Sequence, residues 1–139
     1  MSASVPLSPA DRAACAVCAD WLATSTTVGL VAWFAVAAAL AGLATGGAPH
    51  PVLLLVPLAF VERYLAVRVA LDARLFDRLA TGTLASLDDL DAGLRQTLSV
   101  PAAKAGRPLD ARIAGARRLY RWQTVATVLI VVLAILAWC

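Results

Sequence analysis

The sequence predicts an all-α membrane protein with three transmembrane helices and a cytosolic amphipathic helix between the second and third of them. The chain of 139 residues is 61% hydrophobic and only 15% charged, whereas a soluble domain carries about 25% charged residues. Long apolar runs recur along it, and most charged residues fall between the last two of these runs. We therefore expect a single membrane domain, residues 1–139, whose core is the contact surface between a few helices.

The positive charge of the chain fits a membrane topology better than nucleic-acid binding. The net charge is +3, and eleven of the twelve Lys and Arg residues lie at or after Arg63. Acidic residues are interleaved with them, and the basic stripe with intervening aromatic residues that marks a nucleic-acid interface does not occur. A basic loop beside a membrane span is instead typical of a loop that stays in the cytoplasm. We expect no nucleic-acid partner.

The first predicted span is residues 21–44, an apolar run that suffices for a bilayer core of about 30 Å. Trp21 suits the membrane interface at its start. Upstream, Ser8 followed by Pro9 predicts the start of a short helix, with Ser8 as its cap. Small residues recur along one side of the span, where they would let another helix backbone approach closely: Ser25, Gly29, Ala32, Ala39, Gly42 and Gly46.

The second predicted span, residues 51–71, combines an apolar start with a charged end. A turn rich in helix-breaking residues leads into it. The purely apolar part ends at Val61, about 16 Å from its start at helical rise, so the helix has to continue to about Leu71 to cross the bilayer. Glu62 and Arg63 then lie within the membrane, where ionisable residues are costly and are usually shielded, paired or functional.

The third predicted span, residues 119–138, is the end of a long helix that Pro108 opens. The loop before it, residues 72–118, holds most of the Lys and Arg residues, whereas the turn at 45–50 holds none. Because basic loops stay in the cytoplasm, we expect a multi-pass protein of the bacterial inner membrane with a cytoplasmic N-terminus and a periplasmic C-terminus.

Within that loop, leucines at steps of three and four predict an amphipathic helix from Leu84 to Leu98. Ser86 and Asp89 have the spacing of a capping box. The polar side is acidic, unlike the basic side of helices that lie on lipid, so the leucines are expected to pack on protein, in this chain or in a partner. We expect docking surfaces for a partner on this helix and on the charged segment before it: Arg74, Asp77, Leu87, Leu90 and Leu94.

Polar residues of all three predicted spans fall at a similar depth. Glu62 and Arg63 lie about 18 Å from the outer surface at helical rise, and the same distance counted inward from Trp138 ends between Gln123 and Thr127. Two threonines of the first span lie close to that level, counted from Trp21. We therefore predict an intramembrane polar cluster formed by Thr24, Thr27, Glu62, Arg63, Gln123 and Thr127.

Three roles stay open for the charged pair in this cluster. Glu62 and Arg63 can be satisfied within the protein and set the register of its helices, they can contact another subunit, or Glu62 can carry protons or ions. Adjacent residues point about 100° apart on a helix, so the two side chains do not face each other. Each needs its own partner, which favours a subunit contact or a transport role over a purely internal one.

Enzyme chemistry lacks support in the sequence. The only histidine, His50, is expected on the opposite side of the membrane from Cys15 and Cys18, so no nucleophile–base set forms. A phosphate-binding glycine loop and the H-E-x-x-H zinc motif are absent. The three aspartates of the amphipathic helix fit a solvated face better than a metal site, which needs converging oxygen ligands. We expect no catalytic activity, no metal and no cofactor.

The sequence thus favours a small membrane protein that acts by protein contact. We expect an accessory, assembly or regulatory subunit of a membrane complex, whose partners are the lipid bilayer and either other membrane-protein subunits or further copies of itself. The alternative is a small oligomeric transporter, or an ion or proton pathway, that uses Glu62.

Overall fold

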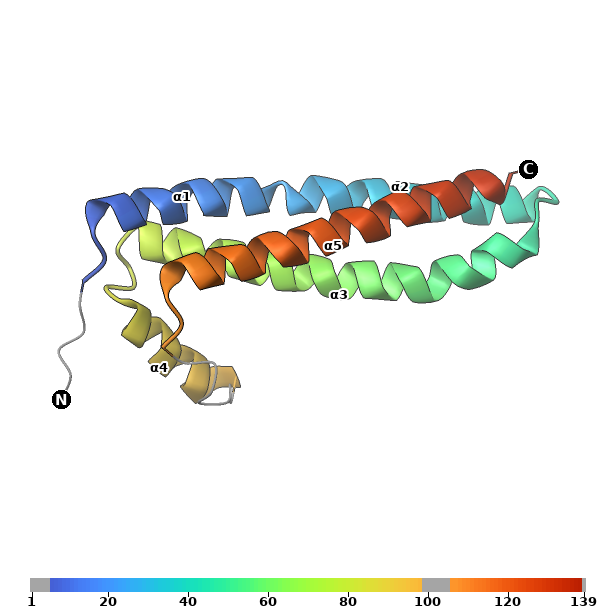
Figure 1. Ribbon diagram of the computed structural model, residues 1–139. Helices are drawn as coiled ribbons and strands as arrows, with labels where there is room; N and C mark the ends of the chain where they lie inside the picture. Colours follow the sequence, from blue (N-terminus) through green and yellow to red (C-terminus); the bar gives the residue numbers. More distant parts are fainter. Residues whose placement is uncertain (1–5, 99–105, 139) are drawn as a thin grey trace. The chain divides into compact units, whose positions relative to one another are not determined.

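The computed structural model describes residues 6–98 and 106–138, and within them the chain is helical with no strands. Five helices follow one another along the sequence (Figure 1). They are α1 (Pro9–Ala23), α2 (Ser25–Ala44), α3 (Pro49–Ala80), α4 (Leu87–Leu98) and α5 (Leu109–Leu136).

Two of the helix starts follow the predicted capping chemistry. Helix α1 begins at Pro9, and the Ser8 hydroxyl accepts the Asp11 N–H at 3.1 Å. Helix α4 begins after Ser86, whose hydroxyl accepts the Asp89 N–H at 3.1 Å. An N-cap oxygen that satisfies a free N–H of the first turn stabilises a helix by about 1 kcal/mol. Both predicted caps are confirmed.

The amphipathic helix is shorter than predicted. We expected it to begin at Leu84, but α4 begins at Leu87. The chain leaves α3 through Gly82, which has a φ of +76°, a conformation that suits glycine because it has no side chain. The Leu84 N–H then donates to the Arg78 carbonyl oxygen at 3.1 Å. Leu84 therefore belongs to the turn that ends α3.

The first apolar run is interrupted once, at Thr24, where we expected a continuous span. The Thr24 carbonyl oxygen accepts the N–H groups of Thr27 and Val28 and begins α2, while α1 ends at Ala23. Thr24 opens a row of four hydroxyl residues, and such side chains compete with the backbone for hydrogen bonds. The interruption lies within this row.

Two helical stretches are long and apolar enough to cross a membrane: Pro9–Ala44, taken across this interruption, and Leu109–Leu136. Only 22% and 28% of their most apolar windows are buried within the protein, so they do not resemble the core helices of a soluble domain. Helix α3 is not one of the two, and its apolar run stops at Glu62 and Arg63.

By its internal contacts the chain divides into two compact units. Unit 1 comprises Met1–Ala23 and Leu71–Arg117, and unit 2 comprises Thr24–Ala70 and Arg118–Cys139. Helices α3 and α5 each contribute one part to both units. Unit 2 contains only five of the charged residues: Glu62, Arg63, Arg68, Arg118 and Arg121.

In unit 2, three helical segments pack against one another. A short turn joins α2 to α3, and there the Ala48 N–H donates to the Ala137 carbonyl oxygen at 3.2 Å, next to the end of α5 (Figure 1). At the other end of unit 2, the Thr24 and Tyr120 hydroxyls are hydrogen-bonded at 2.9 Å. Helix α5 therefore runs parallel to α2 and antiparallel to α3.

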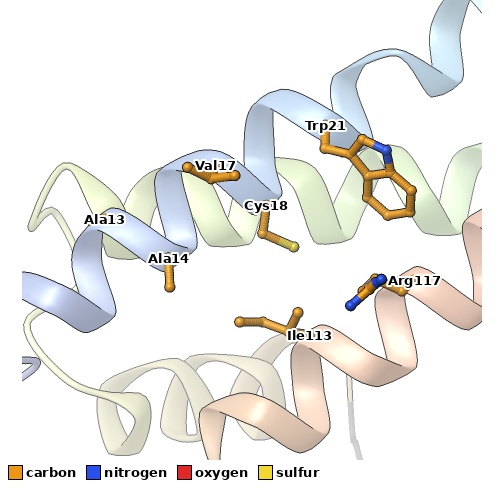
Figure 2. A pocket seen from close by; sticks show the side chains of 7 residues that line it. All are labelled: Ala13, Ala14, Val17, Cys18, Trp21, Ile113 and Arg117. Carbon is orange, nitrogen blue, oxygen red and sulfur yellow. The ribbon is translucent and has the colours of Figure 1, made fainter.

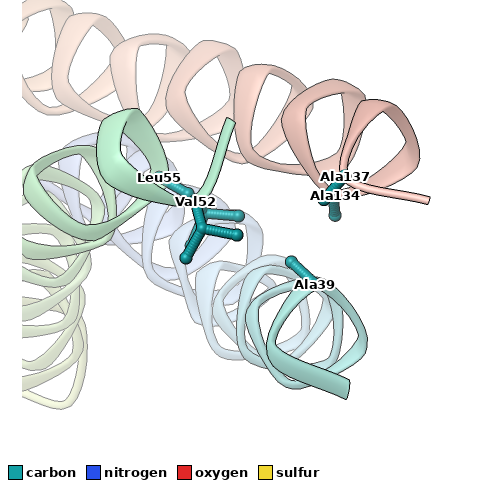
Figure 3. Close-up of a cluster of buried hydrophobic side chains, with 5 residues drawn as sticks. All are labelled: Ala39, Val52, Leu55, Ala134 and Ala137. Carbon is teal, nitrogen blue, oxygen red and sulfur yellow. The ribbon is translucent and has the colours of Figure 1, made fainter. Parts of the chain in front are cut away.

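The core of unit 2 near the turn consists of small and branched apolar side chains (Figure 3). Val52 and Leu55 of α3 meet three alanines there: Ala39 of α2, Ala134 of α5 and Ala137, which follows the end of α5. The small residues of α2 face this interior, since five of the six predicted small residues are buried: Ser25, Gly29, Ala32, Ala39 and Gly42. The sixth, Gly46, lies exposed in the turn. The predicted close packing of this side of α2 is confirmed for the five.

Unit 2 is apolar outside as well as inside. Among the described residues, all but three of the large apolar side chains that are exposed belong to it, including Phe34 at 74% and Phe60 at 74%. Soluble monomers rarely expose apolar patches of more than a few hundred Å². An apolar outer surface of this extent is what lipid-facing helices require.

Unit 1 is more polar and contains the predicted amphipathic helix. Its buried apolar side chains come from four helices, and they include Leu22, Phe76, Leu79, Leu90 and Ala116. The Leu7 N–H donates to the Ala85 carbonyl oxygen at 3.4 Å and joins the start of the chain to the segment before α4.

Candidate functional site

Glu62 is the buried acid of unit 2. Its side chain is only 2% exposed, and Oε1 accepts a hydrogen bond of 3.1 Å from Nε2 of Gln123, which is fully buried. The same Nε2 group donates to the Ser25 carbonyl oxygen at 3.1 Å. One amide group thus links all three helical segments of unit 2, and we call Glu62, Gln123 and Ser25 the Glu62 network.

The sequence places Glu62 on the buried stripe of α3. Val52, Leu55, Ala66 and Val69 are buried on the same helix at spacings that include Glu62. Residues three, four or seven apart share one helix face, so Glu62 occupies a position that an apolar residue would otherwise fill. A buried polar group of this kind has to be hydrogen-bonded, because desolvation without a partner is costly.

A glycine of α2 lies next to the Glu62 carboxylate. A Cβ atom built on Gly29 would lie 3.7 Å from Glu62 Oε1 and 3.9 Å from Gln123 Nε2. Gly29 therefore borders the Glu62 network directly. The contact of Ser25 uses its backbone oxygen, which sequence reasoning did not include because it considered side chains only.

Two buried oxygen atoms near this network have no hydrogen-bond partner among the described residues: Gln123 Oε1 and Thr127 Oγ1. Thr127 is 5% exposed and lies one helical turn beyond Gln123 on α5. Buried polar atoms without partners are uncommon in proteins. These two atoms add polar groups without hydrogen-bond partners to the interior of a unit whose outer surface is apolar.

The structure does not gather all six residues of the predicted polar cluster. Glu62, Gln123 and Thr127 are buried, whereas Thr27 and Arg63 are exposed. Thr24 is exposed as well and bonds to the Tyr120 hydroxyl. The prediction used depth along each helix, but depth does not determine which way a side chain points.

Arg63 lies in a hollowed face between α2 and α3. One hollow, of about 100 Å³, is lined by Ser25, Gly29, Trp33, Arg63 and Ala66 among others. A second hollow, of about 210 Å³, is almost wholly apolar and is lined by Trp33, Leu55, Phe60 and Arg63 among others. The two hollows are adjacent, because both are lined by Trp33 and Arg63, and we call them together the α2–α3 groove.

The predicted docking residues of unit 1 differ in exposure. Arg74 and Asp77 are exposed near the end of α3. Leu90 is buried, and Leu87 and Leu94 are half-buried. The leucine side of α4 is therefore covered in part within this chain, and the two charged residues are the more accessible members of the set.

Asp91 links α4 to the start of α5 and to the residue Gly106 before it. Its Oδ1 accepts a bond of 2.6 Å from Arg112, and its Oδ2 accepts the Gly106 N–H at 2.8 Å. Burial of Asp91 raises the pKa of this carboxyl group, but the bonds from Gly106 and Arg112 outweigh burial and lower the pKa below its ordinary value. We expected a solvated helix face here; Asp91 is buried, while Asp88 and Asp89 are exposed.

An apolar cleft of about 640 Å³ lies in unit 1 beside Cys18, which points toward Ile113 (Figure 2). Trp21 and Arg117 also line it. Cys15 and Cys18 are both buried free cysteines, and Cys139 lies outside the described residues. Among the described residues, no group of three or more His, Cys, Asp or Glu side chains could hold a metal ion.

Comparisons with protein-family models, with curated proteins and with solved structures find no match to this chain.

Proposed function

We propose that the chain is a three-span protein of the bacterial inner membrane. The length of the segments in unit 2 supports this, since α2 has 20 residues and the unit 2 parts of α3 and α5 are similarly long. At 1.5 Å per residue each spans roughly 30 Å, the thickness of a hydrocarbon core. In this proposal α3 crosses the membrane although it carries Glu62 and Arg63, because the Glu62 side chain is buried inside unit 2 and is thus shielded from lipid.

The distribution of charge in unit 2 supports a cytoplasmic N-terminus. Arg68, Arg118 and Arg121 lie toward the end that holds Thr24, and the turn between α2 and α3 at the opposite end has no basic residue. Basic residues mark the cytoplasmic side. Reporter fusions after Gly47 and at Lys104 test this orientation, and a cytoplasmic signal from the fusion after Gly47 would contradict it.

Within that membrane frame, the protein acts as an accessory, assembly or regulatory subunit through contact with another membrane protein. The observation that carries this proposal is Arg63. It is exposed, it lies in the α2–α3 groove, and it makes no ion pair with any of the described residues. Glu62, by contrast, is closed off inside the unit.

Purification in a mild detergent with mass spectrometry of co-eluting chains tests this function. A photo-reactive residue in place of Thr26, which lines the groove, should become cross-linked to a foreign chain. The matched control replaces Val132, an exposed residue of α5 that does not line the groove. A protein that elutes alone and cross-links at neither position would contradict the proposal.

A proton or ion pathway through Glu62 is the second candidate. It is favoured by the two buried oxygen atoms without partners, Gln123 Oε1 and Thr127 Oγ1, which lie on the helix that contacts Glu62. Liposomes that contain the purified protein and a pH-sensitive dye test it. Flux that is lost in Glu62→Gln, in a protein that still folds, would support transport, and the absence of flux in the unsubstituted protein would exclude a proton pathway.

A further inference from the structure

The α2–α3 groove has the features of a binding site for one more helix. Its first hollow is lined by the buried small residues Ser25, Gly29 and Ala66 and by the exposed residues Thr26, Leu30 and Arg63. A helix in this hollow would pack against the exposed residues, and such packing drives helix association in lipid, where the hydrophobic effect contributes nothing. The second hollow continues the groove past Trp33 with apolar walls.

Arg63 gives this groove a positive charge that the hydrocarbon of the bilayer cannot pair with. An arginine within a membrane helix is costly even when its side chain can bend toward the interface. A carboxylate on a facing helix would reduce this cost, because arginine and carboxylate form paired, charge-assisted hydrogen bonds.

This chain cannot supply that carboxylate from its own membrane unit. Glu62 is the single acidic residue of unit 2, it is 2% exposed, and it already accepts the Gln123 amide. Glu62 also neighbours Arg63 directly in sequence, so the two side chains point about 100° apart around the helix. A second copy of the chain would bring another buried Glu62 and another arginine to the contact.

From these observations we infer that the α2–α3 groove binds a transmembrane helix of a different protein, and that this helix carries an Asp or Glu which pairs with Arg63. The inference rests on the proposed function and adds the chemistry of the partner. It disfavours a symmetric contact between the grooves of two copies, because two Arg63 side chains would meet there without a counter-charge.

Synthetic helices of alternating Leu and Ala with one central Glu, or with Gln in its place, test the inference on the full-length protein. The protein is reconstituted in phosphatidylcholine nanodiscs at mildly alkaline pH, and binding of each labelled peptide is measured by energy transfer. We expect the Glu peptide to bind about tenfold more tightly than the Gln peptide, as one charge-assisted contact in lipid would give.

Substitutions identify the arginine responsible. Arg63→Gln should remove the preference for the Glu peptide, and Arg63→Lys should keep part of it, which guards against a loss that reflects misfolding. Arg68→Gln is the matched control, since Arg68 is an exposed arginine of the same helix that lines neither hollow. It should leave the preference unchanged.

Several results would overturn the inference. Equal binding of the two peptides, or a preference that survives Arg63→Gln, would show that Arg63 does not select a carboxylate. Loss of the preference when phosphatidylglycerol is added would show that Arg63 pairs with anionic lipid rather than with a carboxylate of a helix. If a foreign chain is cross-linked at Thr26 but has no Asp or Glu in the cross-linked segment, the inference fails while the proposed function stands. If only a second copy of this chain is captured, the inference and the proposed function both fail.

Discussion

Replacement of Gln123 by Leu should destabilise the protein more than any other change to the Glu62 network. The Gln123 amide makes two buried hydrogen bonds, to Glu62 Oε1 and to the Ser25 carbonyl oxygen, both at 3.1 Å. Each such bond is worth about 1 kcal/mol between membrane helices. Its loss also leaves the Glu62 carboxyl group buried without this partner, which adds about 1–3 kcal/mol. We expect a total of about 3–5 kcal/mol.

Replacement of the other partner, Glu62, by Leu should cost less stability. In Glu62→Leu the Gln123 amide keeps its bond to the Ser25 oxygen, and the buried acid is gone, so we expect a loss of about 1 kcal/mol. The double variant should be more stable than Gln123→Leu alone, because no buried carboxyl group then lacks its partner. Gln96→Leu is the matched control, because it makes the same replacement at a glutamine that is exposed on α4.

Unfolding by SDS in mixed micelles, followed by tryptophan fluorescence and circular dichroism, measures these differences. The control Gln96→Leu should stay within about 0.5 kcal/mol of the unsubstituted protein. The reasoning would be refuted if Gln123→Leu were as stable as this control, or if the two single effects simply added in the double variant, because the two side chains would then not depend on each other.

Three further predictions concern other parts of the chain. Gly47→Ala should cost about 1–3 kcal/mol in the same assay, because its Cβ would overlap the backbone oxygen of Ala137, just after α5. Gly115→Ala, with open space around its Cβ, should instead stabilise α5 by about 0.5–1 kcal/mol. Equal effects of the two substitutions would contradict this. The Asp91 pKa is lowered in the folded state, so its stabilising effect is present above its unfolded pKa of about 4 and is lost as the pH falls through the lower folded value. Hydrogen-exchange protection of α4 should therefore decline in acid in the unsubstituted protein, and Asp91→Asn should abolish this pH dependence while Asp88→Asn preserves it. Trp138→Phe should cost about 1 kcal/mol in the SDS assay, since it removes the 3.1 Å bond from Nε1 to the Ala38 oxygen, and an unchanged midpoint would show that this bond contributes nothing.

Local features were the most predictable from sequence. The caps at Ser8 and Ser86 follow from residue types at fixed spacing, because a hydroxyl can reach an N–H three residues later whatever lies around it. The buried side of α2 was also recognisable, since small residues mark the side where another backbone approaches. The interruption at Thr24 was missed, although the row of hydroxyl residues indicated weakened helical bonding there.

The orientation of side chains around each helix was the least predictable. Residues 52–61 are apolar apart from Pro57, so hydrophobic periodicity does not distinguish the interior face of α3 from the lipid face. Depth along the helices indicated that Glu62, Gln123 and Thr127 lie at one level, but it also included Thr27 and Arg63, which are exposed.

The sequence by itself determined that the chain is helical and apolar, with charges gathered outside its long apolar runs, because these properties depend on composition and on spacing along one chain. Only the tertiary structure decided which of two neighbouring charged residues turns inward. Glu62 does, because Gln123 offers its carboxyl group a hydrogen-bond donor from another helix. Arg63 is thereby left on the outer face, in the α2–α3 groove, because two adjacent residues cannot share one side of a helix.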